Sequence, residues 1–502
     1  MINKKNKITQ APMTFKEYRP ITFDKAINTE KEINDFGACK QTYNFDYDTG
    51  ALIDSFGIED LKTKATFVDA PRGCLFPNVH YRHVYHKFVL KEGPTEYWSI
   101  LFMIDNNLEL YYYPLNRQDA TVKKIEGVTI PYAFTFLDTV PINNDNYLMW
   151  HGWEHRDFYL WKPMATTTAT VHDLEFSYAS ICVYNNRTFA ATAIPSTNNI
   201  IYSEEYGSLN YMNNNKKVGS IKLDDQLGMP LKLMVFQDKL YVIRERGINR
   251  ITQSRDKVAF EHEIVETLNT KIFHTTIQDC GDRILFWTIA GLYEFDGNKC
   301  KRIRLEVEDQ VDFTYHLNLR SGYVNNTYYL SVYIPYADED VVFRPQITEK
   351  PNSIIIYNIV TGKTTVVRGL TVTDFVPIVD SCNSLMAILY WGKNGPNGFG
   401  MVNTSGIIKD QTIRKKWISK MYDFGDSNNY KFIKEMEFVC KSNITLMLYF
   451  DDEVKKIQIT GKNTMQTIKI NRKAKSFGYG FESMSGGNYI SKIKFLVGKY
   501  GN

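Results

Sequence analysis

Cysteine is sparse in this chain, and its spacing excludes two common kinds of stabilised fold. Seven cysteines are scattered over 502 residues, and no two of them have the Cys-x-x-Cys spacing of a zinc ribbon or a redox pair. An odd number at wide spacing also argues against a disulfide framework. We therefore expect free thiols, mostly buried, and assembly in a reducing cytoplasm.

Long apolar runs and a strong excess of charge of one sign are also missing. No stretch of 18 apolar residues is present, and no apolar segment follows the basic start Met1–Lys7, so we expect neither a signal peptide nor stable membrane binding. The chain has 60 basic and 56 acidic residues, for a net charge of +4. A dedicated duplex-binding protein usually has a concentrated basic stripe, and no such stripe is obvious, although Arg414-Lys415-Lys416 and Arg472-Lys473 are local clusters.

No motif in the sequence predicts a catalytic, cofactor or metal site. The triplet His80, His83 and His86 has weak ligand spacing, because alternate residues of a strand point to opposite faces. The same alternation separates the members of three acidic pairs: Glu204-Glu205, Asp224-Asp225 and Asp451-Asp452. There is no Gly-x-Ser-x-Gly elbow and no phosphate-binding glycine loop. We therefore expect no enzymatic activity, no cofactor and no bound metal.

What the chain does have is a repeated strand-turn-strand pattern rich in aromatic residues. Asp238, Asp282 and Asn326 each stand in a polar turn before a run of aromatic and branched residues, at successive intervals of 44 residues. A repeat of about 40–50 residues built from short strands is typical of a β-propeller blade. The sequence therefore predicts an all-β protein containing a β-propeller of about six or seven blades.

Changes in composition divide the chain into three regions. Residues 1–60 are predicted to form an extended N-terminal arm with one short helix near 29–36, lying on a partner or on the chain's own body. Residues 61–410 contain the repeated strands of the propeller. Residues 411–502 alternate apolar and polar residues with turns at Asp451-Asp452 and at 461–463, which predicts a C-terminal β-sandwich.

Two segments resemble the propeller of tail hub or nozzle proteins in short-tailed phages. The first segment is 183–191 with 199–211, and the second is 233–251, where Asp238-Lys239-Leu240-Tyr241-Val242 leads to Glu245-Arg246-Gly247-Ile248. Tyr211 stands where that family usually has Trp, and Asn249 stands where an aromatic residue is common. The resemblance covers residues 180–300 well. Over the rest of the chain, only the general order of the domains is similar.

The resemblance implies a structural protein of the virion tail, assembled in the host cytoplasm. Members of the family form a ring, a hexamer, below the portal and adaptor proteins. They line the channel through which double-stranded DNA passes and anchor fibres or spikes. Six charged residues are candidates for contacts between subunits: Arg244, Glu245, Arg246, Arg414, Lys415 and Lys416. Because Arg244 and Arg246 alternate with Glu245, both arginines are expected on one face of a strand.

Two alternatives remain open from the sequence. One is a propeller-type binding module or receptor-binding protein, and the other is a propeller hydrolase acting on glycans, which would need carboxylates that converge on the axial face. For the tail protein, the near-neutral charge predicts a neutral to acidic channel wall, because a basic wall would hold DNA phosphates. The basic clusters are then expected to face partner subunits.

Overall fold

The chain is almost entirely β-structure. The computed structural model describes residues 13–18, 23, 39–47, 50–60, 81–90, 97–105, 107–115, 122–129, 134–142, 145–152, 155–163, 165–192, 198–203, 219–254, 259–335, 351–379, 384–392, 395–408 and 411–500. The helices in these ranges are single short 3-10 turns: η3 (His274–Thr276), η4 (Glu308–Gln310) and η5 (Phe313–Asn318). The short helix expected near 29–36 lies outside the described residues.

Four sheets of four antiparallel strands each follow the chain in simple up-and-down order. The first contains β6 (Tyr81–Leu90), β7 (Tyr97–Asp105), β8 (Glu109–Pro114) and β9 (Lys123–Thr129). The second contains β17 (Pro230–Phe236), β18 (Lys239–Arg244), β19 (Gly247–Gln253) and β20 (Phe260–Thr267). The third contains β21 (Gln278–Asp279), β22 (Ile284–Thr288), β23 (Gly291–Phe295) and β24 (Cys300–Ile303). The fourth contains β25 (Arg320–Val324), β26 (Thr327–Val332), β27 (Ser353–Asn358) and β28 (Thr364–Arg368).

A seven-stranded sheet lies between the first and second of these. Its strands are β10 (Phe134–Ile142), β11 (Asp145–Gly152), β12 (His155–Trp161), β13 (Thr170–Tyr184), β14 (Arg187–Thr192), β15 (Asn199–Tyr202) and β16 (Gly219–Lys222). The long strand β13 pairs with β12 mainly through its first residues, 170–173, and with β14 mainly through its last, 180–184, while Tyr178 between them lies opposite both His155 and Thr192. The sheet is therefore two four-stranded units that share one strand.

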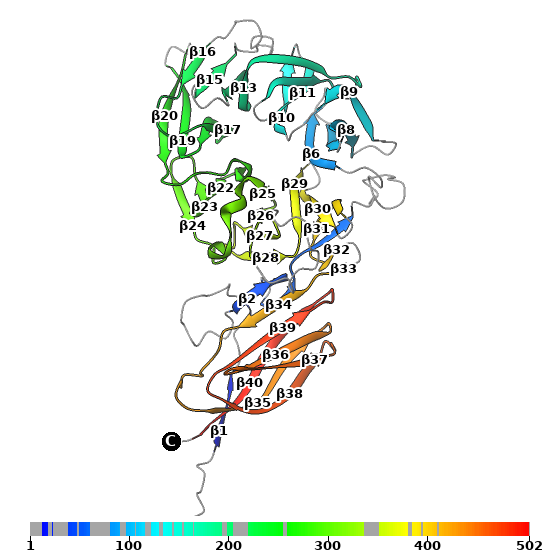
Figure 1. The fold of residues 1–502 in the computed structure, drawn as a ribbon, viewed down its shortest axis with the longest axis vertical. Coiled ribbons are helices and arrows are strands. Elements are labelled where there is room, and N and C mark those ends of the chain that lie inside the picture. The colour runs from blue at the N-terminus through cyan, green and yellow to red at the C-terminus, as the bar shows by residue number, and fades with distance from the viewer. Residues whose placement is uncertain are drawn as a thin grey trace, which may run out of the picture.

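A strand from the N-terminal region completes the sixth sheet of the ring. That sheet contains β29 (Thr371–Val379), β30 (Ser384–Gly392), β31 (Gly395–Asn403), β5 (Gly57–Asp60), β32 (Ile407–Ile408) and β33 (Gln411–Thr412). β5 lies antiparallel to β31, with Ile58 opposite Val402. The six sheets are arranged around a ring with their first strands on the inside, and β29 packs against β6 to join its two ends (Figure 1).

The remaining strands form a second unit of two sheets. One sheet has the order β3 (Phe45–Asp46), β4 (Leu52–Asp54), β40 (Tyr489–Tyr500), β35 (Lys431–Cys440), β38 (Met465–Ala474), with β1 (Met13–Tyr18) also paired to β40. The other has the order β2 (Cys39–Tyr43), β34 (Lys415–Ser419), β39 (Phe477–Ser483), β36 (Ile444–Phe450), β37 (Glu453–Ile459). We call these two sheets the C-terminal unit, although β1 to β4 come from the first 54 residues.

Both sheets of the C-terminal unit bury side chains in one apolar core. Trp417 and Phe481 come from one sheet, and Phe438 and Phe495 come from the other. Exposed residues alternate with buried or half-buried ones along β38, as the sequence pattern of this region predicts, whereas β36 has one fully buried face and a second face that is at least half-buried. The described strands of the first 60 residues lie on the chain's own body, since β1 to β4 join the C-terminal unit and β5 joins the ring.

Hairpin turns occur in the ring where the polar turn residues predict them. Both central residues of the Gln237-Asp238 and Asn325-Asn326 turns, and of a further turn at Asn185-Asn186, have positive φ angles between 48° and 59°. Two-residue turns of this kind twist in the same sense as the strands that they join, and Asn and Asp tolerate them well. Asp282 also lies in the predicted turn, between β21 and β22.

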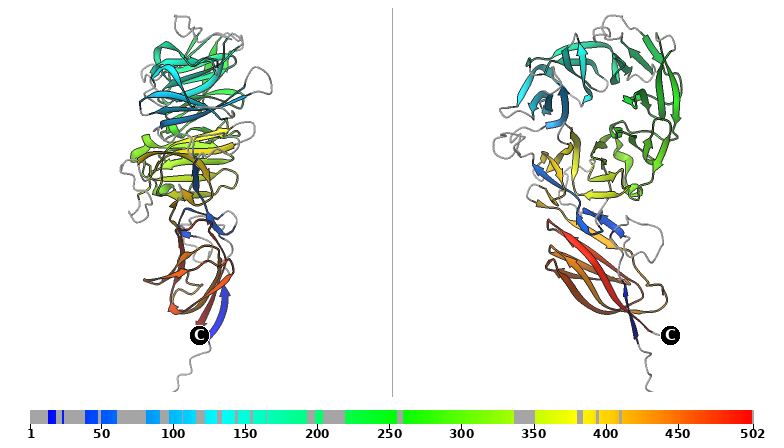
Figure 2. Two further views of the ribbon diagram at one scale, coloured as in Figure 1. Left: turned by 90° about the vertical axis from the view of Figure 1, so that its right-hand side faces the viewer. Right: turned by 180° about the vertical axis from the view of Figure 1, so that it is seen from behind.

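The C-terminal unit attaches to the rim of the ring. It extends away from one side of the ring in the face-on view (Figure 1), and it continues the line of the ring in the edge-on view (Figure 2). β1 and the C-terminal strand β40 run side by side at its far end. Within the described residues, no helix is long and apolar enough to cross a membrane.

Candidate functional site at the junction of the two units

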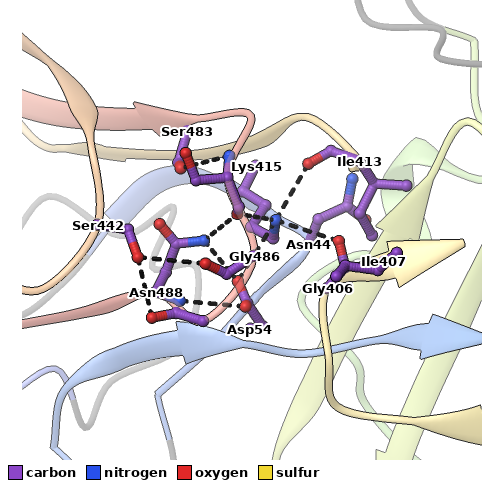
Figure 3. Close-up of polar contacts among 12 residues, drawn as sticks. Asn44, Asp54, Gly406, Ile407, Ile413, Lys415, Ser442, Ser483, Gly486 and Asn488 are labelled. Carbon is purple, nitrogen blue, oxygen red and sulfur yellow. Dashed lines mark hydrogen bonds and ion pairs between the residues drawn. The ribbon is translucent and has the colours of Figure 1, made fainter. Parts of the chain in front are cut away.

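Three segments that are far apart in the sequence meet where the ring joins the C-terminal unit (Figure 3). Asp54 ends β4, Lys415 begins β34, and Asn488 precedes β40. All three are buried: the side chain of Lys415 is 0% exposed, that of Asp54 is 3% exposed, and Asn488 is 5% exposed. We call these three residues the junction triad.

The ammonium group of Lys415 is surrounded by oxygen atoms. It donates hydrogen bonds to the main-chain carbonyls of Ser485 (2.6 Å), Ile413 (3.2 Å) and Gly406 (3.4 Å), and it lies 3.4 Å from Oδ1 of Asp54. Burial lowers the pKa of this lysine below its ordinary value, while the Asp54 carboxylate opposes the shift. The oxygen ligands replace the water that the charge loses on burial.

Asn488 holds the other side of the Asp54 carboxylate. Its main-chain N–H donates to Oδ2 of Asp54 (3.1 Å), and its side-chain amide donates to Oδ1 (2.7 Å). The same amide also donates to the carbonyl of Ser485, which accepts from Lys415 as well. Asp54 is therefore bound from both sides by groups more than 350 residues away in the sequence.

The junction triad is suited to holding segments together rather than to chemical reaction. Elsewhere, a lysine of lowered pKa can act as a nucleophile or base. Here the ammonium group is fully enclosed, and its three protons face four oxygen acceptors. A buried pair that is well hydrogen-bonded fixes geometry, and removing one partner leaves an uncompensated charge.

A second set of contacts joins the two units beside the triad. The side-chain amide of Asn44 donates to the carbonyls of Arg414 (2.6 Å) and Arg368 (3.4 Å), and its oxygen accepts from the main-chain N–H of Arg368 (2.9 Å). The hydroxyl of Tyr47 donates to the carbonyl of Thr364 (3.0 Å). Because β28 belongs to the ring and Asn44 and Tyr47 flank β3 in the C-terminal unit, these bonds tie the two units directly.

Arg244 occupies a separate buried polar cluster inside the ring. Its side chain is 0% exposed, forms an ion pair with Asp225, and donates through Nε to the carbonyl of Gly228 (2.9 Å). Asn249 donates to the other oxygen of Asp225 (3.0 Å) and lies 3.2 Å from Nδ1 of His262. This cluster explains the polar residue at 249, because an aromatic side chain there could not bind Asp225.

The structure corrects the proposed subunit contacts for two of the six residues. Arg244 and Lys415 are enclosed in the chain and bind internal oxygens, so neither is available to a neighbouring subunit. Arg244 and Arg246 also do not share an exposed face, because β18 ends at Arg244 and Arg246 is exposed in the turn that follows.

For the other four residues, contact with a subunit stays a prediction. Glu245 pairs with Lys271 (2.6 Å), and Arg414 pairs with Glu482 (3.0 Å). The side chain of Lys416 is half-buried, and Arg246 is exposed. The basic run at 414–416 is thus divided, with its middle residue inside the molecule and its outer two nearer the surface.

The histidines considered from the sequence lie apart in packed positions, as far as the structure describes them. His83 lies 3.6 Å from Asp374 of the last ring sheet, and His86 is 2.8 Å from the hydroxyl of Ser99. A further histidine outside this triplet, His151, is buried against the ring of Tyr178. No group of three or more metal-ligating residues occurs in the part of the chain that the structure describes, which does not include His80.

The sequence pattern does not indicate Asp54, Asn488 or Asn44, and it presents Asp225 only as a member of an acidic pair, not as the partner of Arg244. Each of these residues binds a partner through a contact that depends on the tertiary fold, and Asp54 and Asn488 are separated by 434 positions. The one local signal was the departure at Asn249, where a polar residue replaced an expected aromatic one. That departure marks the buried cluster around Arg244.

Comparison with known proteins shows no family. No protein-family model and no curated protein matches the sequence. Solved structures similar to the chain include Sqt1 of Saccharomyces cerevisiae, with 10% identity, a TM-score of 0.37, and coverage of 62% of this chain and 85% of that one.

Two further solved structures cover a larger share of both chains. BBS1N in complex with ARL6DN has 10% identity and a TM-score of 0.41, covering 69% of this chain and 97% of that one. A putative exported protein of Bacteroides fragilis has 9% identity and a TM-score of 0.34, covering 70% and 95%. At these TM-scores the neighbours carry no argument about function. The sheets of this chain define an all-β, propeller-like fold on their own geometry.

Proposed function

We propose that the chain is a structural subunit of a phage tail, a hub or nozzle protein that assembles into a ring below the portal and adaptor. In this proposal the ring of sheets is one propeller of seven blades. The shared strand β13 separates two of these blades, and β5 completes the last one. The two sheets of the C-terminal unit are a β-sandwich.

The observation that carries the proposal is the buried connection between the two units. The bonds of Asn44 and Tyr47 to β28, together with the bond of Lys415 to the carbonyl of Gly406, attach the sandwich to the propeller through polar contacts. A subunit of a genome-ejection channel has to keep its shape while DNA moves past it, and a stiff two-unit body suits that task. The resemblance of 180–300 to tail hub propellers supports the same conclusion.

The proposed partners follow from this position in the tail. The chain binds copies of itself in a ring, a hexamer by the resemblance, and contacts the portal, the adaptor or neighbouring tail proteins. It anchors fibres or spikes, and double-stranded DNA passes through the ring without stable binding. We expect the channel wall to be neutral to acidic, since counterion release at a basic wall would retain the DNA. We expect no catalytic activity.

Antibody labelling of phage particles from the source culture, viewed by electron microscopy, tests the proposal. Label at the single portal vertex, at or below the neck, is the expected result. Unlabelled particles together with free protein in the lysate would contradict it and would favour a propeller binding module or a glycan hydrolase. Incubation of the purified chain with host surface glycans, followed by analysis of released sugars, then separates those two alternatives.

A further inference from the structure

The last strand of one sheet in the C-terminal unit buries almost none of its own surface. In β37 (Glu453–Ile459), the first four residues are all exposed, although alternate residues of a strand point to opposite faces. Ile459 is buried and Ile457 packs against the core, so only the second half of the strand rests on its own unit. The first half is open on both faces, and Val454 is 49% exposed.

The surface around β37 is strongly basic. Lys455 and Lys456 are exposed on the strand itself. β38, the last strand of the other sheet in this unit, is tied to β37 by an ion pair of 2.7 Å between Arg472 and Glu453. β38 and its two flanking turns add exposed lysines at four positions: Lys462, Lys469, Lys473 and Lys475.

One strand of the ring has the matching properties with the opposite charge. β20 (Phe260–Thr267) is the last strand of its sheet, and only Phe260 at its beginning is buried. Glu261 and Glu263 are exposed on one face of the strand. On the other face, Ile264 is 51% exposed.

The same division of charge extends over the two parts of the sequence. Residues 411–502 have 17 basic and 8 acidic residues, a formal net charge of +9, whereas residues 1–410 have 43 basic and 48 acidic residues, a net charge of −5. The near-neutral net charge of the whole chain is therefore the sum of two regions with net charges of opposite sign. Two copies of the chain can each supply one side of an electrostatically complementary contact.

We propose that β37 of one copy pairs with β20 of a second copy as neighbouring strands of a shared sheet. Addition of a strand to an exposed sheet edge is a common mode of protein recognition, because main-chain hydrogen bonds provide affinity and the side chains provide specificity. On one face, Lys455 meets Glu261 and Glu263. On the other face, Val454 and Lys456 meet Ile264 and its neighbours.

The structure favours a second copy over a nucleic acid as the partner. A phosphate backbone would bind the lysines, but it would not pair with the edge of a strand or pack against the exposed Val454. A second copy uses all three features and brings a strand of matching length and opposite charge. The contact joins two different surfaces, so it is heterologous and generates a closed ring or an open filament, depending on the rotation between copies. The inference rests on the proposed ring-forming function and identifies the surfaces by which the copies meet.

A charge-swap experiment on the full-length chain tests this contact. Sedimentation velocity at about 50 mM and about 0.5 M salt compares the wild type with three variants. We expect Lys455→Glu/Lys456→Glu to weaken association at least about tenfold, and Glu261→Lys/Glu263→Lys to do the same, since like charges then face each other. We expect the four-residue combination to restore association, because the charges are again opposite. Wild-type association should weaken at the higher salt.

A matched control keeps the charge change but moves it away from the contact. Lys40→Glu/Lys492→Glu reverses two exposed lysines on β2, the opposite edge of the same sheet, and on β40 of the other sheet, and should associate like the wild type. Thermal unfolding of every variant, followed by circular dichroism, shows that the fold is intact. A strand-pairing contact also predicts slower amide hydrogen exchange in β37 and β20 of the assembled protein.

Three results would overturn the proposal. The first is association that the two single-strand variants leave unchanged, and the second is a combined variant that fails to recover. The third is a monomeric wild type whose binding to a short DNA duplex is lost in Lys455→Glu/Lys456→Glu, which would assign the surface to a polyanion. Labelled portal vertices together with ineffective charge swaps would reject this contact alone. Effective swaps together with unlabelled particles would reject only the tail function.

Discussion

Nδ2 of Asn488 lies 2.7 Å from Oδ1 of Asp54, although the two residues are 434 positions apart. The ammonium group of Lys415 approaches the same carboxylate oxygen to 3.4 Å. The carboxylate of Asp54 therefore binds Asn488, just before the last strand β40, and Lys415, the first residue of β34. These three residues of the C-terminal unit lie beside its joint with the ring and are costly to bury alone, so each depends on the presence of the others.

Removal of Lys415 is expected to destabilise the protein strongly. Lys415→Met leaves Asp54 buried without its cation, and we expect the free energy of unfolding to fall by about 3–5 kcal/mol. Urea denaturation measures this change. Lys416→Met is the matched control, because the side chain of Lys416 is half-buried rather than enclosed, and its change should stay within about 0.5 kcal/mol. Equal midpoints for the two variants would contradict the assignment.

Arg244 and Arg246 should behave differently, although they are separated by one residue. Arg244→Met removes the cation beside the buried Asp225, and we expect a loss of about 3–5 kcal/mol in unfolding free energy. Arg246→Met changes an exposed turn residue and should cost less than about 0.5 kcal/mol. Thermal unfolding of the two variants side by side tests this, and a stable Arg244→Met would show that the cluster does not hold the blade.

The buried thiols should react slowly while the protein is folded. Burial raises the pKa of Cys39, Cys182 and Cys280 to about 12. Since the thiolate is the reactive form, iodoacetamide at pH 8 should leave these three residues unlabelled in the native protein and label them in urea. Mass spectrometry of the digested protein gives the extent at each site. Rapid native labelling of Cys39 would show that its strand opens readily.

The same thiols make stability fall at high pH. From the ordinary value of 9.0 up to about 12, the folded chain keeps a proton that the unfolded chain has released. Stability is therefore fully present below pH 9 and decreases above it, by up to about 1.4 kcal/mol per pH unit for each thiol. Urea midpoints between pH 8 and 11 measure the slope. Cys39→Ala should reduce the slope of stability against pH by the contribution of one thiol.

Closure of the ring should depend on the side chain of Ile58. This residue is 3% exposed and packs with Val372 and Ile388 of the last ring sheet. Ile58→Ala is expected to cost about 2–5 kcal/mol and to speed amide hydrogen exchange in β31. The neighbouring Glu59 is exposed, so Glu59→Ala should leave both quantities near their wild-type values. Unchanged exchange in β31 of Ile58→Ala would contradict this role for β5.

Local chemistry made the hairpins of the ring predictable. The turns at Asn185-Asn186 and Asn325-Asn326 need positive φ at both central residues, and asparagine meets that need without tertiary help. The alternation along Met465–Ala474 likewise follows from one face that is turned to the core and one that is exposed. These features depend on neighbours a few positions away, so the sequence displays them directly.

Pairing between distant segments could not be predicted in the same way. Nothing near Ile58 indicates that its partner is Val402, and nothing near Met13 indicates that it lies opposite Tyr500. The basic neighbours of Lys415 favour a position at the surface for this residue. Its burial is decided by Asp54 and Asn488, which no local window of sequence includes.

The pairing of β5 with β31 has a consequence for the order of events during biosynthesis. A ribosome that has just made Gly57–Asp60 has about 340 more residues to add before the partner strand appears, which takes roughly 20–70 s at typical elongation rates. β1 waits still longer for β40. Newly made strands stay without their partners throughout this interval, so the nascent chain is exposed to misassembly until translation is nearly complete. Chaperones that bind extended apolar segments are expected to determine how much of the protein reaches its native state.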